Sequence, residues 1–211
     1  MELKQMYLTP SNYKKIMSKG KGVDFGLIAQ DYATEIVMQS FGVYKPEVKA
    51  FSLAHGIEFE PMAIERFELA NLVTVTKPIL SITHPTIPYI KGRPDGIVSA
   101  SSIIEVKCPS NPINHFNNLK EFCWLNSSKP VNDYMLDYWW QIQGYMWITG
   151  ATTCTFISFD PRYPYELQYI EQTVERCEDS ITDISNRCAK FYNLCLELQM
   201  DMIAKLDIQI D

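Results

Sequence analysis

Long apolar runs are missing from this 211-residue sequence. No stretch approaches the roughly 20 apolar residues that a membrane-spanning helix requires. The opening residues MELKQMYLTPSNYKK also lack the basic start, apolar middle and small-residue cleavage site of a secretory signal. We therefore expect a cytoplasmic protein with no membrane partner.

Clustered metal-binding side chains are missing as well. The six cysteines are scattered without a C-x-x-C pair, and the three histidines lie far apart in the sequence. Zinc sites and iron–sulfur clusters need closely spaced ligands, so neither kind of site is expected. We expect the cysteines to be free thiols in a reducing compartment.

Positive charge is scarce overall but unevenly distributed. The formal net charge is -6, which argues against a polyanionic partner because phosphate contacts normally need lysine and arginine. Residues 1–94, however, carry 11 basic against 9 acidic side chains, whereas residues 95–211 carry 8 against 16. A local phosphate-binding surface is therefore compatible with the first part of the chain, although ordinary surface variation explains the same asymmetry.

Hydrophobic periodicity predicts helices toward both ends of the chain and strands in its middle. Thr9 and Pro10 have the pattern of a helix start, and Gly42 is suited to end the second helix. Pro61 lies inside the third helix, which therefore begins near Glu58 or is kinked. In order, we expect helices over 12–17, 25–39 and 54–70, an antiparallel meander of strands over 73–76, 79–83, 96–99 and 102–107, helices over 113–125 and 133–149, strands over 153–159 and 167–174, and a helix over 178–205.

This order of elements predicts a layered α/β (α+β) fold with a central mixed β-sheet flanked by helices. The length suits one domain with a substantial hydrophobic core. We therefore expect residues 1–211 to form a single domain, with N-terminal helices and a long C-terminal helix.

Three charged side chains stand out in the segment GRPDGIVSASSIIEVKCP, residues 92–109. Alternation along its second strand puts Glu105 and Lys107 on one face with Ile103. If residues 99–102 form a hairpin turn, residue 105 pairs near residue 96, and Asp95 comes within about one residue of Glu105 across the strands. Two carboxylates and an ammonium then share one small patch.

Crowded carboxylates repel each other, so this patch becomes favourable when a hard divalent cation lies between them. Oxygen ligands of this kind suit Mg²⁺, for which Mn²⁺ can substitute. A surface ion pair between Lys107 and one of the acids explains the same residues without a metal.

The same charges match a known nuclease pattern. Asp95 after Pro94, followed by Glu105-Val106-Lys107, resembles the PD-(D/E)xK signature. The setting is more specific than that short pattern: the motif GIEFE precedes it and ends at Glu60, the motif QIQGYMW follows it from Gln141, and FDPR covers residues 159–162.

Together, over about residues 8–162, these motifs resemble the phage lambda exonuclease family, also called the YqaJ-type viral recombinase or alkaline exonuclease family. The resemblance implies a single nuclease domain with a restriction-endonuclease-like core. It also implies a metal site in which Asp95 and Glu105 are ligands and the backbone carbonyl of Val106 is a further one. Glu60 matches the family's upstream glutamate, which assists a metal directly or through water, although Glu58, Glu65 and Glu68 crowd the same helix.

Lys107 stands at the position of the family's catalytic lysine. Carboxylate neighbours raise the pKa of a lysine, so we expect Lys107 to hold the attacking water and stabilise transition-state charge rather than act as a free base. Gln141 matches the family's glutamine on the following helix and would orient that water or the phosphate. Helical spacing groups Gln141 with Asp137, Tyr138 and Tyr145, whereas Trp139 and Met146 point toward the core.

A serine at a helix start is a natural phosphate binder, because free N–H groups and the helix dipole favour anions there. In the resembling family a serine at the position of Ser11, with a basic residue seven positions earlier, contacts a terminal 5′-phosphate. That earlier residue is Lys4 here, which cannot make a bidentate contact, and Arg93 could supply the missing guanidinium. Lys19 and Lys21 could follow the duplex backbone or form a solvated loop.

The sequence therefore predicts a Mg²⁺-dependent double-strand DNA exonuclease. The resemblance further implies digestion from the 5′ end, a ring-shaped homotrimer that threads DNA processively, and a single-strand annealing recombinase as partner. Two alternatives share these residues: another PD-(D/E)xK endonuclease or repair nuclease, and a DNA-binding module with a degenerate site. Retention of Asp95, Glu105 and Lys107 argues against the degenerate module.

Overall fold

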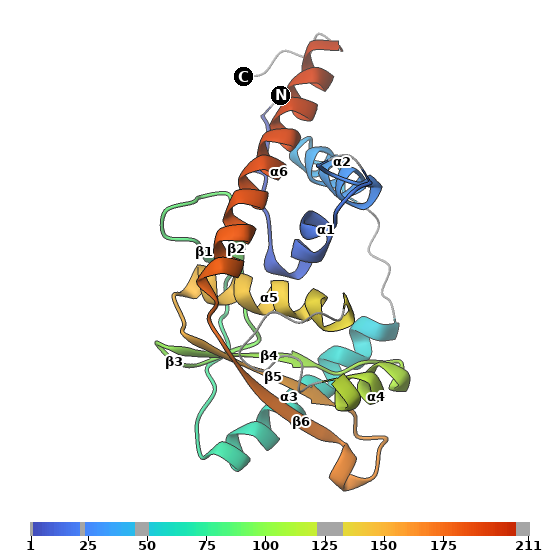
Figure 1. Ribbon diagram of the computed structural model, residues 1–211, viewed down its shortest axis with the longest axis vertical. Helices are drawn as coiled ribbons and strands as arrows, with labels where there is room; N and C mark the ends of the chain where they lie inside the picture. The colour runs from blue at the N-terminus through green and yellow to red at the C-terminus, as the bar shows by residue number, and fades with distance from the viewer. Residues whose placement is uncertain (1, 22–23, 45–50, 122–132, 206–211) are drawn as a thin grey trace.

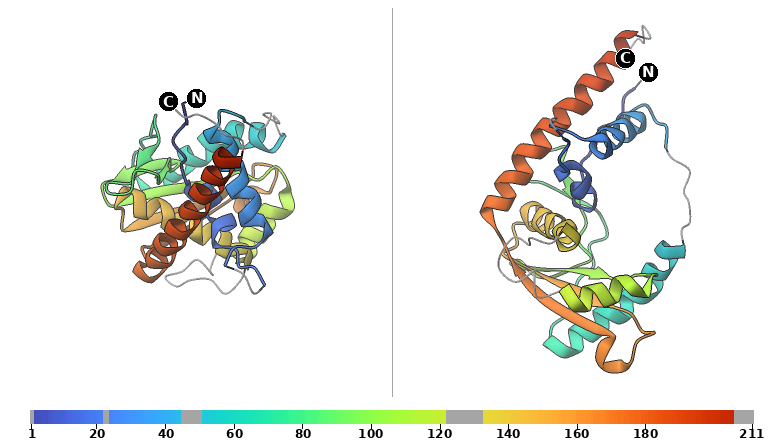
Figure 2. Two further views of the ribbon diagram at one scale, coloured as in Figure 1. Left: turned by 90° about the horizontal axis from the view of Figure 1, so that it is seen from above. Right: turned by 45° about the vertical axis from the view of Figure 1, so that its right-hand side comes forward.

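The structure, a computed structural model, describes residues 2–21, 24–44, 51–121 and 133–205. A central sheet has helix α5 on one face and α3 on the other, and α1, α2 and α6 form a further layer beyond α5 (Figure 1). The view in the right half of Figure 2 shows the same layers. The helices are α1 (Tyr13–Met17), α2 (Leu27–Ser40), α3 (Phe51–Asn71), α4 (Pro112–Glu121), α5 (Asp133–Thr149) and α6 (Glu178–Lys205), with short 3₁₀ helices η1 (Pro10–Asn12) and η3 (Tyr165–Leu167).

The sheet has the order β3-β4-β5-β6. Its strands are β3 (Gly96–Ser99), β4 (Ser102–Lys107), β5 (Thr153–Phe159) and β6 (Tyr169–Glu175). The β3–β4 and β5–β6 pairs are antiparallel, whereas β4 and β5 are parallel and joined by a long connection that contains α4 and α5. The expected central mixed sheet flanked by helices is therefore confirmed.

The expected four-stranded meander over residues 73–107 is wrong. Of its first strand, Thr76 alone forms a bridge, to Ile97, and β1 (Ile82–Thr83) pairs with β2 (Lys91–Gly92) in a separate small sheet. Pro78 lacks the N–H that a ladder needs, so pairing with β3 stops soon after Thr76. Of the expected meander, the structure contains the antiparallel hairpin of β3 and β4.

Two helices differ from expectation in their bounds. Helix α3 begins at Phe51 and includes Pro61 in its interior, so the expected alternative of a start near Glu58 is wrong. Helix α2 ends at Ser40, and Gly42 follows with a φ of 82°, as a glycine terminator should. The expected end of the next helix at residue 125 lies outside the described residues.

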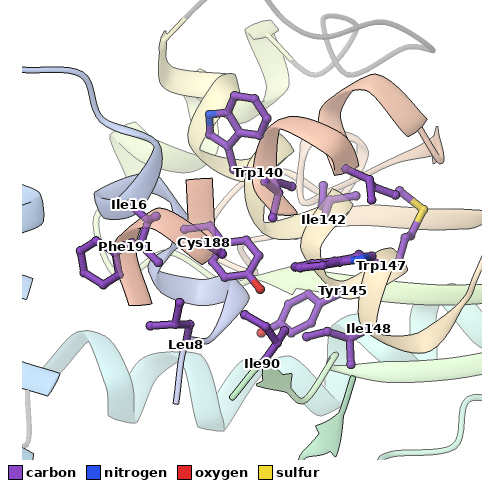
Figure 3. Packing of buried hydrophobic residues seen from close by; sticks show 14 of the residues in the cluster. Leu8, Ile16, Ile90, Trp140, Ile142, Tyr145, Trp147, Ile148, Cys188 and Phe191 are labelled. Atoms are coloured by element: carbon purple, nitrogen blue, oxygen red, sulfur yellow. The ribbon is translucent and has the colours of Figure 1, made fainter. Parts of the chain in front are cut away.

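Strand alternation divides the core into two clusters, one on each face of the sheet. Ile103 packs with Trp139, Phe156 and residues of α1, α2 and α6 on the α5 face, part of which Figure 3 shows. Ile104 and Val106 pack against α3 on the opposite face. The expected partition of β4 is confirmed, and it directs Glu105 and Lys107 toward α5.

The cysteines and the helices of the described residues bear on two further expectations. The cysteines within the described residues are free, as expected: Cys108, Cys154, Cys177, Cys188 and Cys195. Cys123 lies outside the described residues. None of the helices within the described ranges is both long enough and apolar enough to cross a bilayer.

Candidate active site

The hairpin β3–β4 brings Asp95 and Glu105 together. Gly96 pairs with Ile104, so Asp95 comes level with Glu105, one residue closer than the register expected from the sequence. An irregularity between residues 97 and 99 accounts for the difference. Asp95 Oδ2 accepts a 2.7 Å hydrogen bond from the backbone N–H of Val106, which holds the carboxylate against the edge of β4.

Lys107 and Gln141 form a closed network with Glu105. Lys107 Nζ donates to Glu105 Oε1 at 2.6 Å and to Gln141 Oε1 at 3.0 Å, while Gln141 Nε2 donates to the same Glu105 oxygen at 2.7 Å. The Lys107 ammonium also lies 5.6 Å from the centre of the Tyr138 ring, and Gln141 reaches the Tyr145 hydroxyl at 3.5 Å. The site therefore combines Glu105 and Lys107 of β4 with Gln141 of α5.

The face of α5 that points to this network is nearly the one expected. Trp139 and Met146 are fully buried in the core, and Tyr145 is buried between α5 and the segment around Ile90 (Figure 3). Asp137 is the exception, because its half-exposed carboxylate pairs with Lys14 of α1 at 3.5 Å.

The Asp95 carboxylate lies in an unfavourable electrostatic environment. Burial raises the pKa of Asp95 well above its ordinary value, and the negative charge of Glu105 raises it further, although the Val106 N–H acts in the opposite direction. Burial alone would lower the pKa of Lys107, but the adjacent Glu105 outweighs it and raises the pKa. The expected rise in the pKa of Lys107 is found, and its role in the reaction stays a prediction.

Glu60 approaches the same place from α3. Its Oε1 lies 2.5 Å from Lys77 Nζ, in the segment just before β3. Both residues line a pocket of about 390 Å³ together with Arg93 and Asp95. The negative charge of Glu60 also contributes to the raised pKa of Asp95. The structure therefore brings the expected upstream glutamate to the Asp95 side of the site.

The carboxylate oxygens of Asp95, Glu105 and Glu60 are suitable ligands for a divalent cation, although they do not converge on one point. Within the described residues, no three Asp, Glu, His or Cys side chains converge as a group able to hold a metal. Glu60 and Glu105 are instead paired with lysines. Glu105 is 2% exposed, however, and its Oε2 is buried without a hydrogen-bond partner. A buried orphan oxygen beside a second strained carboxylate is a place where a cation would be stabilising.

The backbone of Val106 also faces this place. In a strand, the N–H and C=O of one residue point toward the same neighbouring strand. Because the Val106 N–H bonds to Asp95, its carbonyl is directed toward the same edge. The Val106 carbonyl therefore faces the same edge of β4 as Asp95, and its role as a metal ligand stays a prediction.

Two of the expected phosphate-binding residues, Ser11 and Arg93, lie on segments that pack against each other. Leu8 forms a parallel bridge with Ile90, and the Lys91 N–H donates to the Leu8 carbonyl, so the two segments are joined just before the 3₁₀ helix that contains Ser11. A Cβ on Gly92 would come within 2.9 Å of Pro10 Cδ, which shows how closely the two segments pack. Ser11 is exposed with its Oγ 3.2 Å from Thr9 Oγ1, and Arg93 is exposed beside the pocket that contains Asp95.

The remaining expected phosphate-binding residues lie elsewhere. The Lys4 backbone is bound to Ser40 at the end of α2, and its ammonium donates to the Tyr44 hydroxyl at 3.2 Å. Lys19 and Lys21 border a separate hollow of about 460 Å³ beside the start of α2. The structure thus places Ser11 and Arg93 on neighbouring segments, with the Arg93 guanidinium donating to the Ile79 carbonyl at 3.5 Å, and directs the Lys4 side chain toward Tyr44.

Two residues of the site, Lys77 and Tyr138, are not assigned a role from the sequence. Lys77 gave no signal, because it lies in a segment expected to be part of a plain meander. Tyr138 was placed on the correct face of α5 without a role, yet its ring lies beside the Lys107 ammonium. Tyr138 lies three residues before Gln141, and this spacing places both on one helix face, so it could have indicated that Tyr138 lies near Lys107.

Comparison with known proteins gives consistent matches. A family model described as YqaJ-like viral recombinase domain matches residues 4–152. The structure of an alkaline exonuclease (LHK-Exo) from Laribacter hongkongensis is 27% identical with a TM-score of 0.80, and covers 95% of this chain and 93% of that one. The same enzyme in complex with dAMP gives 28% identity and a TM-score of 0.81 over the same shares.

A phage related exonuclease from Haemophilus somnus 129PT is 17% identical, with a TM-score of 0.75 over 94% of this chain and 97% of that one, and supports the fold alone. A search of curated proteins finds no significant sequence match. The expected restriction-endonuclease-like fold is confirmed by these structural matches.

Proposed function

Because the chain belongs to the YqaJ-like viral recombinase domain family, we propose that it is a Mg²⁺-dependent exonuclease that digests double-stranded DNA from the 5′ end. The observation that carries the proposal is the network of Glu105, Lys107 and Gln141 beside the strained carboxylate of Asp95. Crowded acids, a fixed ammonium and an adjacent open pocket are what phosphodiester hydrolysis with a divalent cation requires.

Mg²⁺ or Mn²⁺ would be held by Asp95, by the free Oε2 of Glu105 and by the carbonyl of Val106, with Glu60 directly or through water. The cation would supply Lewis acidity, lowering the pKa of water and offsetting charge on the phosphate. Its binding would also relieve the repulsion between Asp95 and Glu105.

Lys107 and Gln141 supply the remaining chemistry from fixed positions. The raised pKa of Lys107 keeps its ammonium charged, so its role is to orient water and stabilise the negative charge that develops on the phosphate oxygens. Gln141 holds Lys107 and Glu105 at once and leaves little freedom to either. Preorganised donors of this kind need no rearrangement when charge develops.

The DNA end is a second element of the proposal. Ser11 and Arg93, on adjacent segments, would bind the terminal 5′-phosphate, because a guanidinium matches phosphate geometry. Lys4 is a weaker candidate since its ammonium already donates to Tyr44. Lys19 and Lys21 would contact the duplex backbone at a distance from the cleavage site.

The similar enzyme LHK-Exo is an exonuclease, and its structure in complex with dAMP contains a deoxynucleoside monophosphate. Release of single nucleotides is the outcome that separates an exonuclease from another PD-(D/E)xK endonuclease. A homotrimeric ring, processive digestion and a partner single-strand annealing recombinase complete the proposal by family resemblance.

The test is digestion of linear and closed-circular duplex, each with Mg²⁺ or EDTA, and of linear duplex with and without a 5′-phosphate. We expect mononucleotide release from linear DNA in Mg²⁺, faster with the 5′-phosphate, and none from circles. Equal cutting of circles would favour the endonuclease alternative. Indifference to the 5′-phosphate would remove the proposed roles of Ser11 and Arg93.

A further inference from the structure

The pocket beside Asp95 contains a lysine that the proposed mechanism does not use. Lys77 Nζ lies 2.5 Å from Glu60 Oε1, and the side chains are 59% and 22% exposed, respectively. The backbone next to Lys77 is anchored to β3, since Thr76 and Ile97 exchange hydrogen bonds of 2.8 and 2.9 Å. The backbone at the base of the Lys77 side chain is therefore held beside the start of β3, whereas the ammonium lies at the end of a long side chain that is 59% exposed.

The two lysines of the site differ in how firmly they are held. Lys107 has a 24% exposed side chain and is bound by both Glu105 and Gln141. Lys77 is more exposed, and Glu60 is the ion-pair partner that the structure gives it in the described residues. An exposed pair of this kind contributes little and exchanges readily. Lys77 is thus the lysine whose position can change when the charge of the site changes.

The Lys77 ammonium lies where a cation bound by Glu60 would have to be. A carboxylate oxygen with an ammonium at 2.5 Å is already neutralised, so a divalent cation must compete with Lys77 for it. Once a divalent cation lies near Asp95 and Glu60, like charge disfavours an ammonium in the same place. The pocket of about 390 Å³ that Lys77 lines with Arg93 offers the ammonium an alternative position.

We propose that Lys77 exchanges partners during the reaction cycle: it neutralises Glu60 in the metal-free enzyme, leaves it when a divalent cation binds, and then contacts a phosphate of the DNA strand in the pocket. The proposal rests on the proposed nuclease function. Lys77 is a positioning residue in the first state and a DNA-binding residue in the second. Its flexible four-carbon stem allows both contacts from one fixed backbone position.

The first test is calorimetric titration of the full chain with Mn²⁺ in the absence of DNA. Lys77→Gln should tighten Mn²⁺ binding by about two- to five-fold, the range set by an exposed ion pair. Lys77→Arg should keep wild-type affinity because the competing charge remains. Lys205→Gln is the matched control, since Lys205 forms a 2.6 Å pair with Asp201 at a similar exposure.

The second test measures DNA affinity with a linear duplex whose terminal linkages are phosphorothioates, which slow hydrolysis. In Mn²⁺, Lys77→Gln should weaken binding and reduce the slope of log affinity against log salt by about 1, as expected for one lost phosphate contact. In EDTA the same substitution should leave DNA affinity unchanged, because Lys77 is then engaged by Glu60. A merely structural role for Lys77 would not produce this dependence on the metal.

Unchanged Mn²⁺ affinity in Lys77→Gln would overturn the exchange, as would an equal loss of DNA affinity with and without metal. If the wild-type chain digests linear DNA normally under these outcomes, the nuclease function stands and Lys77 alone is misassigned. A wild-type chain that binds no Mn²⁺ would overturn both.

Discussion

Gln141 Oε1 accepts a hydrogen bond from Lys107 Nζ at 3.0 Å, and the same amide donates to Glu105 at 2.7 Å. One side chain of α5 thus fixes both charged residues of β4. The arrangement predicts that Gln141 contributes to catalysis far more than to stability, because it is only partly buried and its partners are the residues proposed to act on the phosphate and the metal.

Gln141→Ala should lower kcat on linear duplex by about 10²- to 10³-fold, the usual effect of losing one preorganised donor. Gln143→Ala is the matched control on the same helix. Gln143 is fully buried and binds Glu175 and Cys177 backbone groups at 2.8 Å, so its loss should cost about 1–3 kcal/mol in the free energy of unfolding. Steady-state kinetics and urea unfolding of both variants test whether Gln141 affects mainly kcat and Gln143 mainly stability. A similar loss of kcat in both would contradict it.

Asp95→Asn should raise the melting temperature of the metal-free protein while abolishing activity. The pKa of Asp95 is raised in the fold by burial and by Glu105, so ionised Asp95 destabilises the folded state at neutral pH. Removal of that charge should add about 2–4 °C for each kcal/mol relieved in a chain of this size. Thermal unfolding in EDTA measures the change, and a lower melting temperature would show that the carboxylate is not strained.

Addition of Mg²⁺ or Mn²⁺ should stabilise the wild-type protein, because a ligand that binds only the folded state contributes about 2.7 kcal/mol at 100 times its Kd. Glu105→Gln should lose this stabilisation. Asp137→Asn should keep it, since Asp137 lies on α5 but pairs with Lys14 outside the site. Thermal unfolding with and without metal distinguishes the variants. Equal stabilisation of both would remove Glu105 from the metal site.

Acid should destabilise the fold partly through His115. Burial lowers the pKa of this histidine, whose ring nitrogens lie 2.8 Å from Ser158 Oγ and from the Leu167 carbonyl oxygen. The unfolded chain therefore binds a proton below about pH 6.5 that the folded chain resists, and stability falls as the pH decreases from there.

His115→Gln tests this explanation by urea unfolding between pH 7.5 and 5, a range that spans the ordinary histidine pKa. The variant should be less stable at neutral pH but show a shallower loss of stability toward acid. The same slope in variant and wild type would assign the acid sensitivity to other groups.

Much of the site followed from local pattern alone. Alternation along β4 predicts that Glu105 and Lys107 share a face, because successive side chains of a strand point in opposite directions whatever surrounds them. The short hairpin brings Asp95 close to Glu105 for a similarly local reason, although its irregularity shifted the register by one residue. Helical spacing likewise predicts that Tyr138 and Tyr145 share a face with Gln141, although Asp137, grouped with them, pairs with Lys14 instead.

Contacts between residues far apart in the sequence were decided only by the tertiary fold. The sequence contains Glu60 and Lys77, yet nothing in the intervening residues indicates that α3 and the segment before β3 bring them within 2.5 Å. The contact of Lys4 with Tyr44 depends on the docking of the N-terminal segment against the end of α2, and the closeness of the Ser11 and Arg93 segments depends on the pairing of Leu8 with Ile90. Periodicity reports which face of an element is buried, whereas contacts between elements depend on how those faces pack, and packing is decided only when the whole core forms.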